Sequence, residues 1–203
     1  MTRIEIPYYH QTLDFTCGPA CLLMAMNHFS PGVGLTQAIE LDLWREATLV
    51  ETFGTGRFGL ALAAARRGFR VQVADNLDGV EYYAAIRRHH PEHREDLLTL
   101  MHEDVRTKCL ALEVGQARKP ITLSDLKGAV LDGQIPILLT STTYFPEDPD
   151  IPHWVVFTGF DEEFAYVHDP LGDQGENFPL PLDVMEDAIG FEGDRCVVTI
   201  SGK

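Results

Sequence analysis

The stretch around Cys17 constrains this chain more than any other part of its sequence. Gly18 and Pro19 follow the cysteine, and an apolar, helix-favouring run then extends from 20 to 29. Proline suits the first turn of a helix, where its missing N–H costs nothing. Cys17 is therefore expected at a helix N-terminus, where unpaired N–H groups and the helix dipole favour a thiolate. Because the thiolate is the reactive form of cysteine, this position indicates a catalytic nucleophile.

A glutamine lies close before this cysteine. Gln11 precedes Cys17 by six residues, near enough in sequence for the chain to loop back beside the sulfur. The side-chain NH₂ of a glutamine can donate to a developing oxyanion together with the backbone N–H of the nucleophile. Gln11 is therefore predicted to be an oxyanion donor.

Two further candidate residues flank a predicted hairpin. His153 begins one predicted strand, Asp169 follows the next, and an acidic turn at 161–163 joins the two. Strands joined in this way pair as a hairpin, so His153 and Asp169 are expected to be neighbours across the ladder. A nucleophilic cysteine usually works with a histidine base, and the histidine with a group that holds its tautomer. Strand alternation puts the adjacent His168 on the opposite face from Asp169.

The remaining pattern predicts helices mainly in the first half of the chain and strands in the second. Helices are expected over 18–29, 36–48, 60–67 and 122–131, and strands over 3–9, 69–74, 135–140, 153–159, 164–168 and 195–200. The polar stretch 79–119 is expected to be a helical insertion, interrupted at Pro91. Together these elements predict an α+β fold in which a helical part packs on an antiparallel sheet.

Composition bounds the class of protein. A length of 203 residues suits a single domain, 1–203, and a hydrophobic fraction of 45% is enough for a core. The net charge of −15 argues against a nucleic-acid partner, which would need basic clusters. The N-terminus lacks the apolar core of a signal peptide, and no apolar run approaches the ~20 residues of a membrane span. A cytoplasmic protein without a membrane partner is therefore expected.

The residues quoted above resemble a known family. The chain looks like the papain-like cysteine peptidases that trim double-glycine leaders from bacteriocins, and it is more closely similar to stand-alone, bacteriocin-peptidase-like bacterial proteins that lack the exporter. The resemblance rests on Gln11, the segment from Asp14 to Ala20, the segment from Pro152 to Val156 with Gly159, and the run His168, Asp169 and Pro170.

This resemblance implies a fold, an activity and a set of roles. The fold would be that of papain-like cysteine peptidases, and the activity would be hydrolysis of a peptide or protein substrate through an acyl-enzyme. Cys17 would be the nucleophile, His153 the general base and acid, Asp169 the group that orients the histidine, and Gln11 the oxyanion donor. No cofactor and no metal are expected.

Other functions remain open from the sequence. The same acyl-enzyme could pass its acyl group to an amine or thiol, as in a transferase, or the chain could bind a peptide without cleaving it. Gly54, Gly56 and Gly59 fit Gly-x-Gly-x-x-Gly at the start of a predicted helix, which is the outline of a dinucleotide-binding fingerprint. The poor strand before them and the lack of repeated βα units favour instead a glycine-rich turn beside the cleft.

Metal sites and disulfides have weak support. The cysteines at 17, 21, 109 and 196 form no disulfide-scaffold pattern. Cys21, one helical turn after Cys17, is expected to pack in the core, since a Cys-x₃-Cys zinc site would need further ligands at usual spacing. Three histidines, at 89, 90 and 93, suggest a metal, but Pro91 breaks the helix register that would align them. A solvated corner is expected there.

Overall fold

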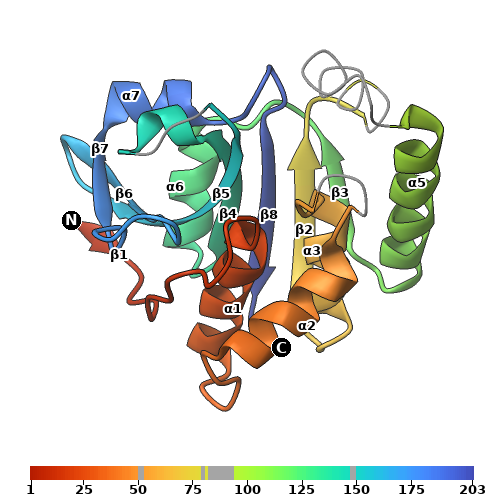
Figure 1. Ribbon diagram of the computed structural model, residues 1–203. Helices are drawn as coiled ribbons and strands as arrows, with labels where there is room; N and C mark the ends of the chain where they lie inside the picture. Colours follow the sequence, from red (N-terminus) through yellow and green to blue (C-terminus); the bar gives the residue numbers. More distant parts are fainter. Residues whose placement is uncertain (50–52, 79–80, 82–93, 147–149) are drawn as a thin grey trace.

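One eight-stranded sheet organises the computed structural model, which describes residues 1–49, 53–78, 81, 94–146 and 150–203 (Figure 1). The strands are β1 Thr2–Arg3, β2 Arg70–Asp75, β3 Gly115–Arg118, β4 Ile135–Ser141, β5 Pro152–Phe160, β6 Phe164–His168, β7 Phe178–Pro181 and β8 Cys196–Ser201. Their order across the sheet is β3-β2-β8-β4-β5-β6-β7, and β1 pairs with β5. The described pairings are antiparallel except that of β2 with β3.

Helices cover both faces of the sheet. They are α1 Cys17–Phe29, α2 Gln37–Ala47, α3 Arg57–Ala65, α5 Glu95–Ala111, α6 Leu123–Leu131 and α7 Leu182–Ala188, with a short 3₁₀ turn, η1, at Thr142–Tyr144. One core lies between the sheet and α1, α2 and α3, and a second lies between the sheet and α6 and α7 (Figure 1). Alternate residues of β5 serve the two cores: Trp154 and Val156 face the first, and Val155 and Phe157 the second.

Most of the predicted elements are confirmed. The helix after Cys17 begins at that residue, and the helix predicted from 36 begins at Gln37 with Thr36 as its N-cap. At the start of α6, Thr122 and Asp125 form a reciprocal capping box in which each side chain accepts the other residue's backbone N–H. The helices and the hairpin that carry the candidate residues therefore follow from local sequence signals.

Three predictions need correction. The strand predicted over 3–9 is only Thr2–Arg3, which pair with Phe160 and Gly159 of β5, beyond the residues of β5 that pair with β4. The helical insertion predicted over 79–119 ends at Ala111; Gly115–Arg118 form β3, which packs parallel to β2, so the sheet is not purely antiparallel. Glu113, with a φ of 57°, reverses the chain between the two elements. The break predicted at Pro91 lies outside the described residues.

An irregularity in β5 shapes the hairpin. The pairing of β5 with β6 shifts register between Phe157 and Gly159, so Thr158 is an extra residue on β5. Its hydroxyl lies 3.2 Å from the carbonyl oxygen of Tyr166 and 3.0 Å from the side-chain oxygen of Asn177. The bulge is therefore held by contacts to β6 and to the segment after it.

The bulge decides which face of the sheet carries Asp169. Beyond it, His168 lies opposite Val156, so the next residue, Asp169, falls level with Val155. Val155 and His153 are two residues apart and share a face. If the same residues paired regularly, with Thr158 opposite Val167, Asp169 would fall level with Val156 on the opposite face. The predicted neighbours across the ladder are thus diagonal neighbours, brought to one face by the bulge.

Packing of α2 against α3 requires a glycine, and this can be tested. A Cβ at Gly59 would lie 2.5 Å from the carbonyl oxygen of Ala47 and 2.7 Å from its Cα. Gly59→Ala should therefore lower the free energy of unfolding by about 1–3 kcal/mol. Gly128→Ala in α6, where a Cβ meets nothing within 4 Å, should raise it by about 0.5–1 kcal/mol. Urea denaturation measures both, and equal effects would contradict the close approach.

Candidate active site

His153 and Asp169 form a hydrogen-bonded pair at the end of the β5–β6 hairpin. Nε2 of His153 lies 2.7 Å from Oδ1 of Asp169, and the two residues are only 2% and 1% exposed. The same oxygen accepts the backbone N–H of Leu171 at 3.0 Å. Because Asp169 occupies Nε2, the other ring nitrogen, Nδ1, is the one available to a nucleophile.

Cys17 is the first residue of α1 and is partly exposed. Burial raises the pKa of its thiol, but a hydrogen bond to His153, the charge of that ring, and the backbone N–H groups of Trp154 and Gly18 outweigh it. The pKa therefore lies below its ordinary value, as a nucleophile requires.

The histidine is shifted in the complementary direction. Burial lowers the pKa of His153, but its hydrogen bonds to Asp169 and Cys17 and the charges of both partners raise it to about 10. A lowered thiol pKa beside a raised imidazole pKa favours a thiolate–imidazolium pair over two neutral groups. The sequence-predicted Cys17, His153 and Asp169 thus meet in one place.

A second cysteine ties α1 to β5. The thiol of Cys21 donates to the carbonyl oxygen of Trp154 at 3.2 Å, one residue after His153 in the strand. Cys21 is fully buried in the core, as predicted. Burial and the nearby charge of Cys17 raise its pKa well above the ordinary value, so it stays a thiol.

Gln11 lies buried beside the loop that carries Asp169. Its backbone N–H donates to the carbonyl oxygen of Pro170 at 2.8 Å, and its side-chain Nε2 donates to that of Leu13 at 2.8 Å. Its side-chain oxygen is buried without a hydrogen-bond partner. An amide NH₂ has two N–H groups, so one of them remains for a further acceptor.

Two residues that sequence reasoning missed hold the backbone around Asp169. The hydroxyl of Tyr8 lies within hydrogen-bond distance of the carbonyl oxygens of Asp169, at 2.8 Å, and Gly172, at 3.0 Å. Gly175 accepts the backbone N–H of Asp169 at 2.9 Å, and a Cβ there would lie 1.9 Å from the carbonyl oxygen of Asp169. No sequence pattern marks this role, because Tyr8 lies in an expected strand and Gly175 is one of many glycines.

His168 faces away from the pair, as strand alternation predicts. Its Nε2 lies 2.9 Å from the carbonyl oxygen of Ile6, and its Nδ1 accepts the backbone N–H of Asn177 at 2.9 Å. Burial lowers its pKa. The ring therefore acts as a neutral structural bridge.

Comparison with known proteins identifies a family and a shared fold. The family profile described as Peptidase_C39 like family matches residues 6–189. The chain belongs to this family. A C39-like peptidase from Bacillus anthracis has a similar structure at 16% identity, with a TM-score of 0.58 over 98% of this chain and 96% of that one. The peptidase domain of Streptococcus ComA, a bi-functional ABC transporter involved in a quorum sensing pathway, matches at 12% identity, with a TM-score of 0.52 over 98% and 100%.

These findings confirm the predicted family resemblance and the papain-like α+β fold. No curated protein matches the chain significantly in sequence. Membership in the Peptidase_C39 like family supports a cysteine-peptidase-like function, and both structural similarities are similarities of fold.

The glycine-rich segment of this C39-like chain does not follow the dinucleotide-binding arrangement. That fingerprint needs a parallel strand directly before its helix. The described residues before α3 instead include an isolated antiparallel bridge between Thr48 and Thr55. Gly18 explains the position of the segment: a Cβ there would lie 2.3 Å from the hydroxyl oxygen of Thr55. The carbonyl oxygen of Thr55 also accepts Nε1 of Trp154 at 3.2 Å, so the turn packs beside the nucleophile.

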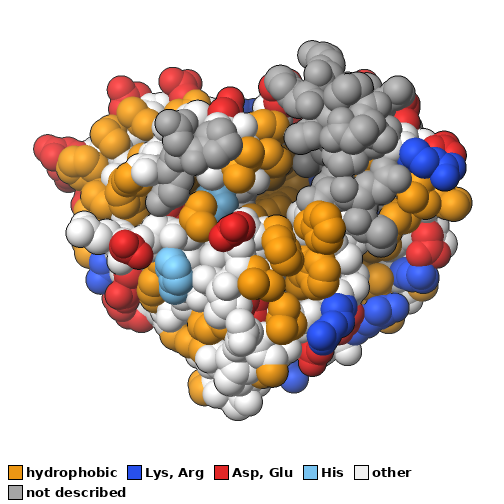
Figure 2. Space-filling view, viewed as in Figure 1, with side chains coloured by type: hydrophobic (Ala, Val, Ile, Leu, Met, Phe, Trp, Pro, Cys, Tyr) orange, Lys and Arg blue, Asp and Glu red, His pale blue; other side chains and the backbone are white. Residues whose placement is uncertain are grey.

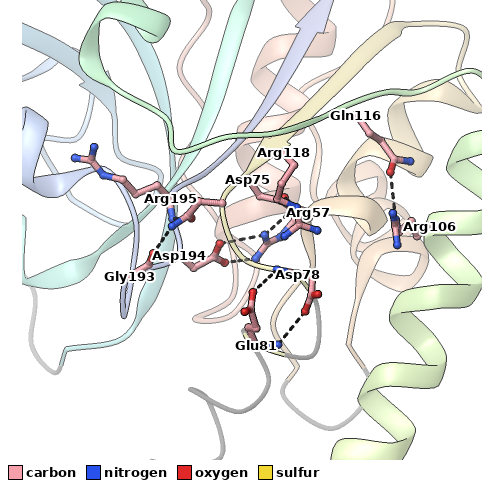
Figure 3. A network of polar contacts seen from close by, with 11 residues as sticks. Arg57, Asp75, Asp78, Glu81, Arg106, Gln116, Arg118, Gly193, Asp194 and Arg195 are labelled. Carbon is pink, nitrogen blue, oxygen red and sulfur yellow. Dashed lines mark hydrogen bonds and ion pairs between the residues drawn. The ribbon is translucent and has the colours of Figure 1, made fainter.

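The start of α3 also differs from a phosphate-binding site, because protein carboxylates lie there. Figure 3 shows Arg57, the first residue of α3, between Asp75 at the end of β2 and Asp194 before β8. Nη1 of Arg57 donates to Asp75 at 2.9 Å and to Asp194 at 3.1 Å, and all three side chains are buried. The helix start is therefore neutralised by protein carboxylates.

A group of hydrophobic side chains lies beside the start of α1. In the space-filling view, hydrophobic side chains gather over α2 and α3 beside that point, and basic side chains lie toward the rim (Figure 2).

Within the part of the chain that the structure describes, no helix is both long and apolar enough to cross a bilayer. Over the same residues, no three His, Cys, Asp or Glu side chains are grouped as metal ligands.

The shifted pKa values predict a distinctive pH dependence. Alkylation of Cys17 by iodoacetamide should become fast at a pH below the ordinary thiol pKa of ~8.5, because the pKa of this thiol is lowered. It should then stay level until His153 loses its proton near pH 10. In His153→Ala the rise should move to the ordinary thiol range or above, because burial alone raises the thiol pKa. Rates measured from pH 4 to 11 test this.

A matched control is available at the other end of α1. His28 lies in the last turn of that helix, and His28→Ala should leave the alkylation profile unchanged. A His153→Ala profile that coincides with the wild-type profile would contradict the ion pair.

Proposed function

We propose that this chain is a cysteine peptidase that hydrolyses peptide bonds through Cys17, His153 and Asp169, with Gln11 as an oxyanion donor. The observation that carries the proposal is the hydrogen bond between His153 and Asp169, on a ring that also lowers the pKa of Cys17. Membership in the Peptidase_C39 like family adds independent support.

The first half of the proposed reaction acylates the enzyme. The thiolate of Cys17 attacks the scissile carbonyl, a C–S bond forms, and the carbonyl oxygen becomes an oxyanion. The remaining side-chain N–H of Gln11 and the backbone N–H of Cys17 stabilise that charge. The His153 imidazolium then gives its proton to the leaving nitrogen as the C–N bond breaks. The amine product departs and a thioester remains.

The second half releases the acyl group. His153, now neutral, takes a proton from water as the water oxygen attacks the thioester. The C–S bond breaks, Cys17 leaves as the thiolate, and the peptide acid is released. Asp169 keeps its place on Nε2 throughout, which holds the ring in the tautomer that both steps need.

An aromatic cluster beside the nucleophile supports a peptide substrate. The rings of Phe15 and Trp44 lie 5.2 Å apart and those of Phe15 and Phe53 5.7 Å apart, and Phe53 is 58% exposed. Phe15 is two residues from Cys17, so a bound peptide could place an apolar side chain on this cluster. The net charge of −15 favours neutral or cationic peptides over acidic ones.

Covalent labelling tests the nucleophile. A peptide with an electrophilic warhead should label the wild-type protein at one site, and Cys17→Ala should abolish the label. Cys21→Ala should retain it, because the pKa of the Cys21 thiol lies well above the ordinary value. Mass spectrometry of the labelled protein identifies the site, and labelling that survives in Cys17→Ala would count against the proposal.

Turnover tests the orienting carboxylate. A peptide library should yield fragments that end in a free carboxylic acid, and the best peptide then serves as the substrate. Asp169→Ala should lower kcat at least ~10²-fold, because the imidazole loses its fixed tautomer. Asp173→Ala, an exposed position in the same loop, should leave kcat within ~2-fold. Peptides that bind but stay intact would indicate a binding domain.

A further inference from the structure

Glu40 is a fully buried carboxylate outside the four predicted site residues. It lies on α2 with an exposed fraction of 0%. Among the residues that the structure describes, no lysine, arginine or histidine forms an ion pair with it. A buried charge without a counter-ion is costly unless hydrogen bonds satisfy it. The role of Glu40 should therefore follow from the groups that donate hydrogen bonds to it.

Four donors bind Glu40, and all come from the segment 9–16. Oε1 accepts the backbone N–H of Thr12 at 2.9 Å and the hydroxyl of Thr16 at 2.5 Å. Oε2 accepts the hydroxyls of Thr12 at 2.6 Å and Tyr9 at 3.0 Å. Hydrogen bonds to an ionised acceptor are roughly twice as strong as neutral ones. The carboxylate therefore fixes this irregular segment at three residues.

The segment held by Glu40 carries Gln11. Tyr9 and Thr12 flank Gln11 on both sides in sequence, and the backbone N–H of Gln11 donates to Pro170, next to Asp169. Glu40 and the Asp169 loop thus clamp the backbone of Gln11 from two directions. The position of its side-chain N–H groups depends on that clamp.

Glu40 also acts at the start of α1. Thr16 is the N-cap residue of this helix, yet its hydroxyl oxygen makes no capping bond. Its O–H donates to Glu40, and its oxygen accepts the backbone N–H of Leu13 at 3.3 Å. An N-cap hydroxyl ordinarily accepts the N–H of the second or third helical residue. Here those residues are Gly18 and Pro19, and Pro19 has no N–H. Because Glu40 and Leu13 hold the hydroxyl in this orientation, the N–H of Gly18 is left to Cys17, whose pKa it helps to lower.

We propose that Glu40 is a positioning residue for the reaction described under Proposed function, on which this role rests. Its carboxylate holds the segment 9–16 so that Gln11 faces the oxyanion and the first N–H groups of α1 stay uncapped. Glu40 itself touches neither substrate nor the reacting atoms.

A double-mutant cycle tests this role with the peptide selected from the library. Glu40→Ala should lower kcat by about 10- to 100-fold, part of the ~10²–10³ expected for a lost oxyanion donor. KM should stay within ~3-fold. Combined with Gln11→Ala, the loss should fall well short of the product of the two single losses, because both variants remove one interaction. Multiplicative losses would mean that Glu40 acts only through overall stability.

Two variants guard against a trivial loss of folding. In Glu40→Gln the amide oxygen can still accept from Thr12 N–H, and its NH₂ can donate to the hydroxyls of Tyr9 and Thr12. This variant should recover most of the kcat lost in Glu40→Ala. Glu46 lies on the same helix, but its carboxylate binds Arg67 at 2.7 Å and not the segment 9–16. Glu46→Ala should therefore leave kcat unchanged.

The outcomes separate the two proposals. An active wild type whose kcat is unchanged in Glu40→Ala, or is not restored in Glu40→Gln, would overturn the role of Glu40 alone. A wild type that neither cleaves peptides nor reacts selectively at Cys17 would overturn the proposed function, and the role of Glu40 with it.

Discussion

The arrangement depends on a contact between α1 and the main chain of β5 at Trp154. The N–H of Trp154 helps to stabilise Cys17, and its carbonyl oxygen accepts the thiol of Cys21. Because the two cysteines lie one helical turn apart, a single strand residue sets both the height and the rotation of the helix. His153 immediately precedes Trp154 in the strand. The nucleophile and the imidazole are thus brought together by backbone geometry.

Local signals predicted much of the fold, and long-range pairing accounts for what they missed. The capping box at Thr122 and the proline after Cys17 mark helix starts without reference to the rest of the chain. Strands β3 and β7 are only four residues each and lie at the two edges of the sheet, where partners rather than alternation create the strand. The sequence pattern therefore predicts helix at 115–118, where the folded chain forms the parallel edge strand β3.

The candidate site also has residues that the sequence predicts and one that it does not. Chemical type and spacing suggest a nucleophile, an oxyanion donor, a base and an orienting group, and so predict Cys17, Gln11, His153 and Asp169. Glu40 could not be predicted in this way, since a carboxylate normally indicates a solvated surface, and only the folded chain shows it buried on a helix face with Leu43 and Ala47. Its partners come from an irregular segment with no periodicity to interpret.

Because Thr158 is an extra residue in β5, the faces on which His153 and Asp169 lie depend on whether the number of residues between each of them and the bulge is odd or even. Removing or adding one residue within β5 between His153 and the bulge, or within the paired part of β6 before Asp169, would turn one of the two side chains to the other face of the sheet. Two such changes could compensate each other, whereas the turn at 161–163 could change length without affecting the pair. Alignments of this region should therefore be judged by whether the residue count on each arm stays odd or even, as much as by identity at each position.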